Sequence, residues 1–327
     1  MFALSRLKRA ACAGLLALVG AAAAHANTLT VTHWGSGMYG LPFAVALDQG
    51  FFKEAGIDVT GFITSSGGGT TVRNAMASDI PYGEVALPAA LAAIKQGVKL
   101  TIVHGGVISL ADNVWVATKD SPLSSIQDLK GKNLGYSSPR SVTDMVSTVA
   151  LTEAGIMDDV KRTAVGSTSS ALTALREGGV DVIYMIEPSL SAHKDSLKVV
   201  FRSSEALPKM TQTVGVVRTD YLEQNGKVIE AIIEGRRRGV EFIKTHPEEA
   251  AASLAKHYKL DPAVARSAVE SVLADKSDYW SDGRLDYDGM EAMLRGLVLV
   301  KAIDEGPFDW KDVVDERFLP AELRAGQ

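Results

Sequence analysis

Short apolar runs alternate with segments of helical period along most of this 327-residue chain. The spacing of Ile229, Ile232, Ile233, Val240 and Ile243 is typical of one buried face of a helix. The apolar runs predict strands over residues 29–33, 79–84, 113–119, 132–136, 181–187 and 213–218. Because strands and helices alternate, the pattern predicts an α/β protein built on parallel sheets.

The order of these elements repeats after about one hundred residues. The tetrapeptide Glu-Ala-Gly-Ile at 54–57 recurs at 153–156, 99 positions later. A strand and a small-residue loop precede each copy, and a Gly/Ser/Thr loop, a short helix and a strand follow it. The matching loops are 34–39 with 137–141, and 64–70 with 166–170. This repeat predicts two α/β lobes.

The predicted lobes are residues 27–112 plus 218–327, and residues 113–217, joined by two crossing segments. The strand over 213–218 is expected to return the chain to the first lobe. Residues 263–327 are expected to be mostly helical, with a polar break at 277–288. Ligands of open α/β sheets bind where strands end and loops lead into helices. The matched loops therefore predict a central ligand cleft between the lobes.

Residues 1–26 are interpreted as a secretory signal peptide rather than as part of the fold. A basic start with Arg6, Lys8 and Arg9 precedes an apolar run, and Ala24-His25-Ala26 ends it with small residues where a signal peptidase cleaves. We expect cleavage after Ala26 and a periplasmic mature protein; the alternative is an N-terminal helix retained in the fold. The loss of three positive charges changes the net charge from −5 to −8.

Composition narrows the classes of function. With 46% hydrophobic and 22% charged residues the chain is globular rather than disordered. Its acidic balance argues against nucleic-acid binding. Cys12 is the one cysteine and would leave with the signal peptide, so no disulfide, cysteine-ligated metal or cysteine nucleophile is expected. The six histidines lack metal-ligand spacing, and no hydrolase motif is present. We expect neither a metal, a cofactor nor a catalytic centre.

The loop over 137–141, Ser-Ser-Pro-Arg-Ser, is a candidate anion site. Ser138 before Pro139 is expected to cap a helix whose free N–H groups face the cleft. Arg140 is suited to grip a carboxylate or sulfonate through two hydrogen bonds. The alternative is that Ser138 only caps the helix and that Arg140 is solvated.

The loop over 65–70 is rich in glycine, which lets a backbone approach a ligand closely. It lacks the Lys-Ser/Thr ending of a phosphate-binding loop, so nucleotide binding is rejected. A plain flexible turn is the alternative to ligand contact.

Aromatic and acidic residues at strand ends complete the candidate site. The aromatic residues offer a flat slot for an apolar or planar ligand, although some are expected in the core. Glu84 and Glu187 occupy matching strands and would accept hydrogen bonds from a ligand; a structural turn with Pro188 is the alternative for Glu187. The candidate ligand contacts are Trp34, Ser36, Gly37, Tyr39, Ser65, Ser66, Gly67, Gly68, Tyr82, Glu84, Trp115, Ser137, Ser138, Arg140, Ser141, Tyr184 and Glu187.

The chain resembles the solute-binding proteins of nitrate/sulfonate/taurine ABC importers, the NMT1/THI5-like group. The resemblance lies in the stretch Phe-Ala-Val-Ala-Leu-Asp-Gln-Gly-Phe-Phe-Lys-Glu-Ala-Gly-Ile-Asp-Val at 43–59, in residues 89–97, in Asp-Leu-Lys-Gly-Lys-Asn-Leu-Gly at 128–135, in residues 174–182 and in Glu187-Pro188. It covers nearly the whole chain after residue 26. It implies a type II periplasmic binding protein fold, with ligand contacts in the loops at 34–39, 64–70, 82–85, 137–141 and 184–187.

The resemblance also implies a function: hinged lobes close on a small solute and deliver it to an inner-membrane permease driven by a separate ATPase. We expect a monomeric, non-enzymatic receptor for a small organic anion, a sulfonate or a carboxylate. The first alternative is a receptor for a planar nitrogen heterocycle, such as a pyrimidine precursor of thiamine. The second is a THI5-like pyrimidine-phosphate synthase, whose cysteine-rich motif this chain lacks.

Overall fold

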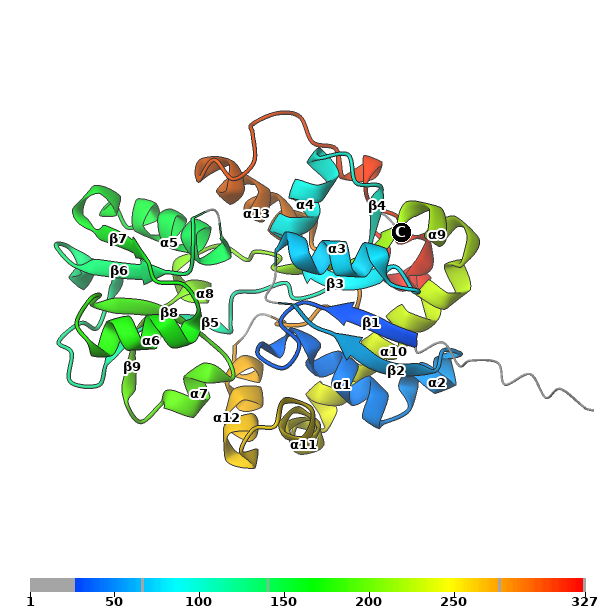
Figure 1. Cartoon of the computed structure of the whole chain (residues 1–327), viewed down its shortest axis with the longest axis horizontal. Coiled ribbons are helices and arrows are strands. Elements are labelled where there is room, and N and C mark those ends of the chain that lie inside the picture. The colour runs from blue at the N-terminus through cyan, green and yellow to red at the C-terminus, as the bar shows by residue number, and fades with distance from the viewer. Residues whose placement is uncertain (1–26, 66–67, 140, 276–277, 326–327) are drawn as a thin grey trace, which may run out of the picture.

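The computed structural model describes residues 27–325 except 66–67, 140 and 276–277. The predicted signal peptide and its cleavage site therefore lie outside the described residues. The described chain forms two five-stranded sheets, each with helices on both faces, which lie side by side as two lobes (Figure 1). The predicted two-lobed α/β architecture is confirmed.

The sheet of the first lobe is mixed. Its strands, in spatial order, are β2 (Val59–Ile63), β1 (Asn27–Val31), β3 (Tyr82–Ala86), β10 (Thr213–Arg218) and β4 (Leu100–Gly105). β1, β2 and β3 are parallel, but β10 pairs antiparallel with both β3 and β4.

The sheet of the second lobe repeats this arrangement. Its strands, in spatial order, are β7 (Lys161–Ala164), β6 (Asn133–Tyr136), β8 (Val182–Ile186), β5 (Asn113–Thr118) and β9 (Leu197–Arg202). β5 pairs antiparallel with β8 and β9. The expectation of all-parallel sheets is wrong, because the strand that enters each sheet from the other lobe runs against its neighbours.

The internal repeat predicted from the tetrapeptide is visible in the backbone. Gly56 ends α2 (Phe51–Ala55) and Gly155 follows α5 (Val142–Glu153), both with positive φ, 105° and 68°. In each copy the isoleucine after the glycine donates its N–H to the carbonyl five residues earlier, at 2.9 Å for Ile57 and 3.0 Å for Ile156. Both copies therefore end a helix with the same left-handed cap.

The chain crosses between the lobes twice, through residues 106–112 and 207–212. β10 belongs to the first sheet, hydrogen-bonded between β3 and β4. The chain has thus returned to the first lobe by Thr213, five residues before the predicted boundary at 218. The boundary shifts because the whole strand 213–218, and not only the segment after it, pairs with the first sheet.

The helices cover both faces of the two sheets. Those of the first lobe are α1 (Leu41–Asp48), α2, α3 (Gly69–Ala77), α4 (Leu87–Lys95), α9 (Thr219–Gln224), α10 (Gly226–Thr245), α11 (Pro247–Tyr258), α12 (Pro262–Leu273) and α13 (Tyr287–Leu299). Those of the second lobe are α5, α6 (Thr168–Arg176), α7 (Ser189–His193) and α8 (Ser203–Ala206). The expected helix starts at His246-Pro247 and Asp261-Pro262 are confirmed.

Short 3-10 turns fill the remaining connections. They are η1 (Met38–Gly40), η2 (Ile126–Leu129), η3 (Met157–Asp159), η4 (Trp310–Asp312), η5 (Glu316–Phe318) and η6 (Ala321–Leu323). The expectation that residues 263–327 are mostly helical holds only as far as Leu299. The segment beyond is held to the sheet by backbone bonds instead, such as Asp315 N–H to the Ile102 carbonyl at 2.9 Å.

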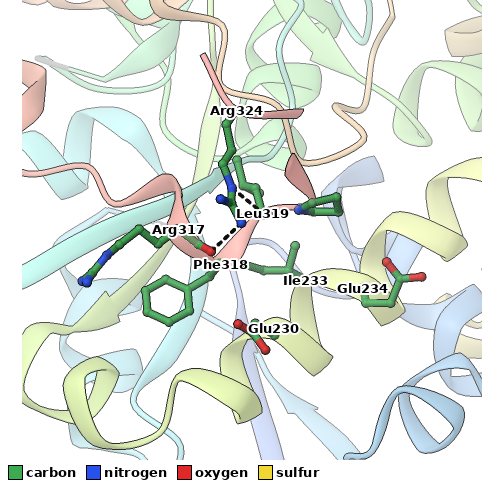
Figure 2. Close-up of a pocket in the computed structure, with 8 residues that line it drawn as sticks. Glu230, Ile233, Glu234, Arg317, Phe318, Leu319 and Arg324 are labelled. Atoms are coloured by element: carbon green, nitrogen blue, oxygen red, sulfur yellow. Dashed lines mark hydrogen bonds between the residues drawn. The ribbon is translucent and has the colours of Figure 1, made fainter. Parts of the chain in front are cut away.

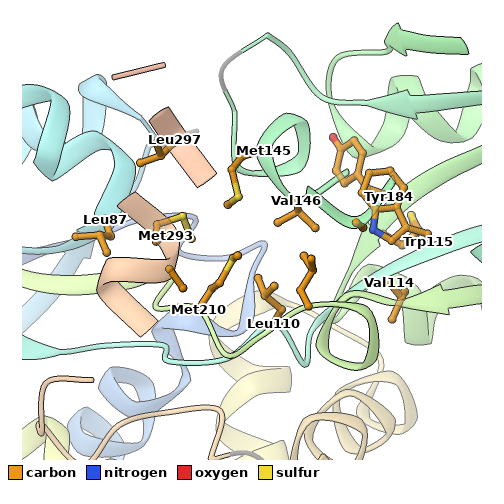
Figure 3. Packing of buried hydrophobic residues seen from close by; sticks show 14 of the residues in the cluster. Leu87, Leu110, Val114, Trp115, Met145, Val146, Tyr184, Met210, Met293 and Leu297 are labelled. Atoms are coloured by element: carbon orange, nitrogen blue, oxygen red, sulfur yellow. The ribbon is translucent and has the colours of Figure 1, made fainter. Parts of the chain in front are cut away.

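One apolar cluster runs through both lobes. It includes Leu87 of α4 and Met293 of α13 from the first lobe, and Met145 of α5 and Trp115 of β5 from the second (Figure 3). α13 packs on α5 where Gly296 faces the Met145 side chain. The two lobes therefore share a core around the crossing segments. No helix among the described residues is long and apolar enough to span a membrane.

Candidate functional site

The loops that follow β1 and β2 are tied together in the first lobe. The Thr64 hydroxyl donates to the Trp34 carbonyl at 2.9 Å, and His33 N–H donates to the Ser65 carbonyl at 3.3 Å. The half-buried Trp34 ring packs against Phe62, with ring centroids 4.2 Å apart. The predicted contacts Trp34 and Ser65 thus share one loop cluster.

Ser36, Gly37 and Tyr39 continue this cluster toward the crossing segments. Ser36 is exposed, whereas Gly37 and Tyr39 are buried. The Gly37 carbonyl accepts the Tyr258 hydroxyl at 2.9 Å, and the Tyr39 hydroxyl donates to Gln212 Oε1 at 3.2 Å. Tyr39 therefore connects the β1 loop to the second crossing segment.

A group of hydroxyls surrounds the start of α5 in the second lobe. Ser141 is the N-cap: its hydroxyl accepts the Asp144 N–H at 3.1 Å. The Ser137 hydroxyl donates to Ser141 Oγ at 2.9 Å and lies 2.7 Å from Thr143 Oγ1. The expectation that Ser138 caps this helix is wrong, since Ser-Val-Thr-Asp at 141–144 supplies a capping hydroxyl with an acidic residue three positions later. Ser138 is exposed.

Tyr184 joins the loops that follow β6 and β7. Its hydroxyl donates to the Gly166 carbonyl at 2.8 Å, and Gly166 N–H donates to the Ser137 carbonyl at 2.9 Å. The structure therefore brings together Ser137, Ser141 and Tyr184, three of the predicted contacts of the second lobe. Ser167 caps α6 beside them by accepting the Ser170 N–H at 3.2 Å.

Two of the predicted aromatic contacts lie inside the cores. Tyr82 and Trp115 have no exposed surface. The Tyr82 hydroxyl lies 2.8 Å from His104 Nε2, and the Trp115 indole donates to Ser203 Oγ at 3.0 Å. Their polar atoms already have partners, so in this conformation neither side chain offers a free group to a ligand.

Glu84 forms an ion pair in the core of the first lobe. Its Oε2 accepts from Arg236 Nε at 2.6 Å, and its Oε1 accepts the Thr213 hydroxyl at 2.8 Å. Both side chains of the pair are at most 1% exposed. Arg236 neutralises Glu84, so this carboxylate supplies no unpaired negative charge for a ligand.

Glu187 lies where the second lobe meets the first. Its Oε2 accepts the Ser191 N–H at 3.1 Å, and Ser271 of α12 faces the same carboxylate. Burial raises the pKa of Glu187 above its ordinary value. Glu84 and Glu187 do not occupy equivalent sheet positions. Glu84 pairs with Gly215, which directly precedes an irregularity in β10, whereas Trp115, which directly precedes the corresponding irregularity in β5, pairs with Tyr184.

The predicted contacts Ser66, Gly67 and Arg140 lie outside the described residues. Gly68 is exposed, with φ of 64°, and precedes α3. Among the described residues, the candidate site therefore consists of a first-lobe cluster around Trp34 and Ser65 and a second-lobe cluster around Ser137, Ser141 and Tyr184.

Two cavities lie in the first lobe, away from these clusters. One of about 220 Å³ is bordered by α10 and the C-terminal segment, where Arg324 donates to the Arg317 and Leu319 carbonyls (Figure 2). The other, of about 260 Å³, lies beside the crossing segments and is bordered by Lys209, Lys244 and Trp280. Of the predicted contacts that the structure describes, none lines either cavity.

Several residues near the site were not predicted from the sequence. Arg236 and Thr213 engage Glu84, and Gln212 binds Tyr39. Arg162 donates to Asp144 Oδ1 at 2.5 Å beneath the first turn of α5. In the sequence, the acidic residue at position 144 indicates the cap at Ser141. No local sequence pattern indicates the pairs Glu84–Arg236 or Tyr39–Gln212, because their members lie far apart along the chain. Among the described residues no His/Cys/Asp/Glu group is arranged to hold a metal ion.

The fold is that of the two-lobed periplasmic binding proteins. The structure resembles the aliphatic sulphonate binding protein SsuA of Escherichia coli, with a TM-score of 0.72 and 17% identity over 88% of this chain and 96% of that one. It also resembles the alkanesulfonate-binding protein SsuA of Xanthomonas axonopodis pv. citri bound to MOPS, with a TM-score of 0.67 and 15% identity over 88% and 97% of the chains. The desulfurization enzyme DszB shares the fold, with a TM-score of 0.64 and 16% identity over 89% and 97%.

The NMT1/THI5-like family model matches residues 38–250, about two thirds of the sequence. The chain belongs to this family, as the resemblance at residues 43–59 indicates. No curated protein matches the sequence.

Proposed function

We propose that this protein is a periplasmic receptor that captures a small organic solute between its lobes and delivers it to an ABC importer. The observation that carries the proposal is the pair of sheets with the same strand order, joined by the two crossing segments and by packing around them. Such an architecture permits hinge closure around a ligand. The sulfonate-binding proteins of the same fold and the sequence of residues 1–26 support export and uptake.

A small organic anion, a sulfonate or a carboxylate, is the proposed ligand class. Glu84 is neutralised by Arg236, and burial raises the pKa of Glu187, so neither favours a cationic ligand. The hydroxyl cluster of Ser137 and Ser141 at the N-terminus of α5 favours an anion. Arg140, one position before the N-cap, is proposed as the cationic clamp.

The binding mechanism follows from the two clusters. A ligand that contacts Trp34 and Ser65 of one lobe and Ser141 and Tyr184 of the other gains its full binding energy only when the lobes approach each other. It therefore shifts the population toward the closed arrangement. No bond is broken, and reopening at a permease with its separate ATPase releases the solute. We propose a monomer with no role in nucleic-acid binding.

A ligand screen by thermal shift tests this proposal. Alkanesulfonates, MOPS, carboxylates and pyrimidines are compared at equal concentrations. A true ligand at a hundred times its Kd stabilises the fold by about 2.7 kcal/mol, which raises Tm by several degrees. Sulfonates or carboxylates are expected to raise Tm. A shift with pyrimidines alone would contradict the anion class, and conversion of a bound compound into product would favour an enzyme, since DszB shares the fold.

Arg140→Ala tests the anion clamp once a ligand is known. Loss of a charge-assisted, two-bond contact is expected to weaken binding at least tenfold, which calorimetry measures. Arg176→Ala, which removes an exposed arginine at the far end of α6, is the matched control and should leave Kd unchanged. Equal Kd values for Arg140→Ala and the unmodified protein would remove Arg140 from the site.

A further inference from the structure

The two crossing segments touch through a carboxylate and an amide. Gln212 Nε2 donates to Asp112 Oδ1 at 2.7 Å and to the Ser109 carbonyl at 2.7 Å. Backbone bonds join the same segments, with Gln212 N–H donating to the Val107 carbonyl at 2.7 Å. Asp112 and Gln212 thus connect the two passages of the chain between the lobes.

These two residues occupy equivalent positions in the repeat. Asp112 directly precedes β5, and Gln212 directly precedes β10, the antiparallel strands of the two sheets. The Asp112 carbonyl accepts the N–H of Glu187 after β8, at 3.3 Å. The Gln212 carbonyl accepts the N–H of Leu87 after β3, at 2.9 Å. The contact therefore lies where the two halves of the fold meet, and a relative rotation of the lobes must disturb it.

The Asp112 carboxylate is fully buried among groups from both lobes. The hydroxyls of Tyr39, in η1, and Tyr279, in the segment before α13, face it from the first lobe. Glu187, itself opposed by Arg202 of β9, faces it from the second. Neither Asp112 Oδ2 nor the Tyr279 hydroxyl completes a hydrogen bond within the described residues.

Burial raises the pKa of Asp112 to about 6. The Gln212 hydrogen bond and the nearby Tyr279 hydroxyl lower this pKa, and the charge of Glu187 raises it further. A buried carboxyl with a raised pKa binds its proton more tightly in the packed arrangement than in water. The Gln212 hydrogen bond favours the ionised carboxylate, but burial outweighs it, so the packed arrangement of the crossing segments is more favourable when Asp112 is neutral.

We propose that the Asp112–Gln212 contact is a proton-sensitive latch on the relative position of the two lobes. Protonation of Asp112 stabilises the packed crossing segments seen here, and ionisation favours an arrangement in which the carboxylate reaches water. The latch rests on the proposed function only in that it requires the lobes to move. It needs no ligand.

The sign and size of the effect follow from linkage. With a pKa of about 6 in the packed arrangement and about 3.9 for a hydrated aspartate, the ratio of packed to hydrated molecules is about tenfold higher at pH 5 than at pH 7.5. The ratio falls as the pH rises through 6 and is nearly constant above about pH 7.

Spin-label distances between the lobes test the latch. In the full chain with Cys12→Ser, labels are placed at Lys53→Cys of the first lobe and Asp158→Cys of the second, both exposed. Without ligand, the distance distribution is expected to shift toward the packed population as the pH falls from 7.5 to 5. Asp112→Asn, which keeps the shape and removes the titration, is expected to hold the low-pH distribution at every pH. A pH shift that persists in Asp112→Asn would overturn the latch.

Two further variants sharpen the test. Asp48→Asn, a carboxylate bound by Lys256 and Ser253 on the outer side of the first lobe, should retain the pH shift. Gln212→Glu places a second carboxyl beside Asp112 and should move the midpoint to higher pH; an unmoved midpoint argues against the contact. Distances that respond to a ligand but not to pH would defeat the latch alone, whereas distances that respond to neither would defeat lobe closure as well.

Discussion

The ion pair of Glu84 and Arg236 joins residues 152 positions apart inside the first lobe. Removal of one partner of a buried pair leaves the other charge uncompensated, which costs about 3–5 kcal/mol. Glu84→Gln is therefore expected to lower the free energy of unfolding by that amount in urea titrations. Glu234→Gln is the matched control, because its pair with Arg237 is partly exposed and such pairs contribute about 0–1 kcal/mol. Equal losses in the two variants would contradict the structural role of Glu84.

At the scale of single residues, the sequence predicts the loops of the candidate site better than it predicts the roles of their side chains. Ser137, Ser141 and Tyr184 were chosen by position and do lie in one cluster. Glu84 was chosen by the same reasoning, yet its environment depends on Arg236 of a distant helix. Chain position indicates which strand end a residue occupies, but only the packed fold decides whether its charge is neutralised.

The repeated helix ends at Gly56 and Gly155 make a prediction at the scale of elements. Both have left-handed φ values, which a side chain tolerates at a cost of about 1–2 kcal/mol. Gly56→Ala and Gly155→Ala should each lower the free energy of unfolding by about that amount, measured in urea. Gly61→Ala in β2 is the control, since its φ is ordinary and an added Cβ would approach only Thr28, at 3.9 Å. A control as unstable as the two cap variants would show that the cap geometry does not matter.

The strands missed by the hydrophobic pattern share a position in the fold. β2, β4, β7 and β9 are the edge strands of the two sheets, and the pattern predicts only central ones. An edge strand is covered less fully than a central one: β2 has one buried residue of five, and β7 has none among its four. The apolar run that marks a central strand is therefore absent there. β4 and β9 are covered more fully, with five and three of their six residues buried, and the C-terminal segment with η5 covers β4.

The whole molecule is expected to unfold in one step, because one apolar cluster includes both lobes. Met145→Ala removes buried contacts between α5 and α13 and should cost about 2–5 kcal/mol. Scanning calorimetry should show a single transition at lower temperature. Met157→Ala, a half-buried methionine within the second lobe, is the control and should cost less. Two separate transitions in the unmodified protein would contradict a shared core.

The presence of two lobes, the order of the repeated elements along the chain and the two crossings follow from sequence, because they depend on the order of elements. The contacts between lobes do not, since Asp112 and Gln212 lie 100 residues apart and meet only when both sheets are complete.

The two crossing segments also make the second lobe one continuous insertion in the first, which can be exchanged as a unit. The chain leaves the first sheet at Gly105 and rejoins it at Thr213, and these ends are adjacent, since Gly106 N–H donates to the Thr213 carbonyl at 3.0 Å. A single exchange of the intervening segment would graft half of a relative's binding surface onto this scaffold. Chimaeras with two parental specificities could therefore be built, provided that the junction keeps the residues at 112 and 212 compatible.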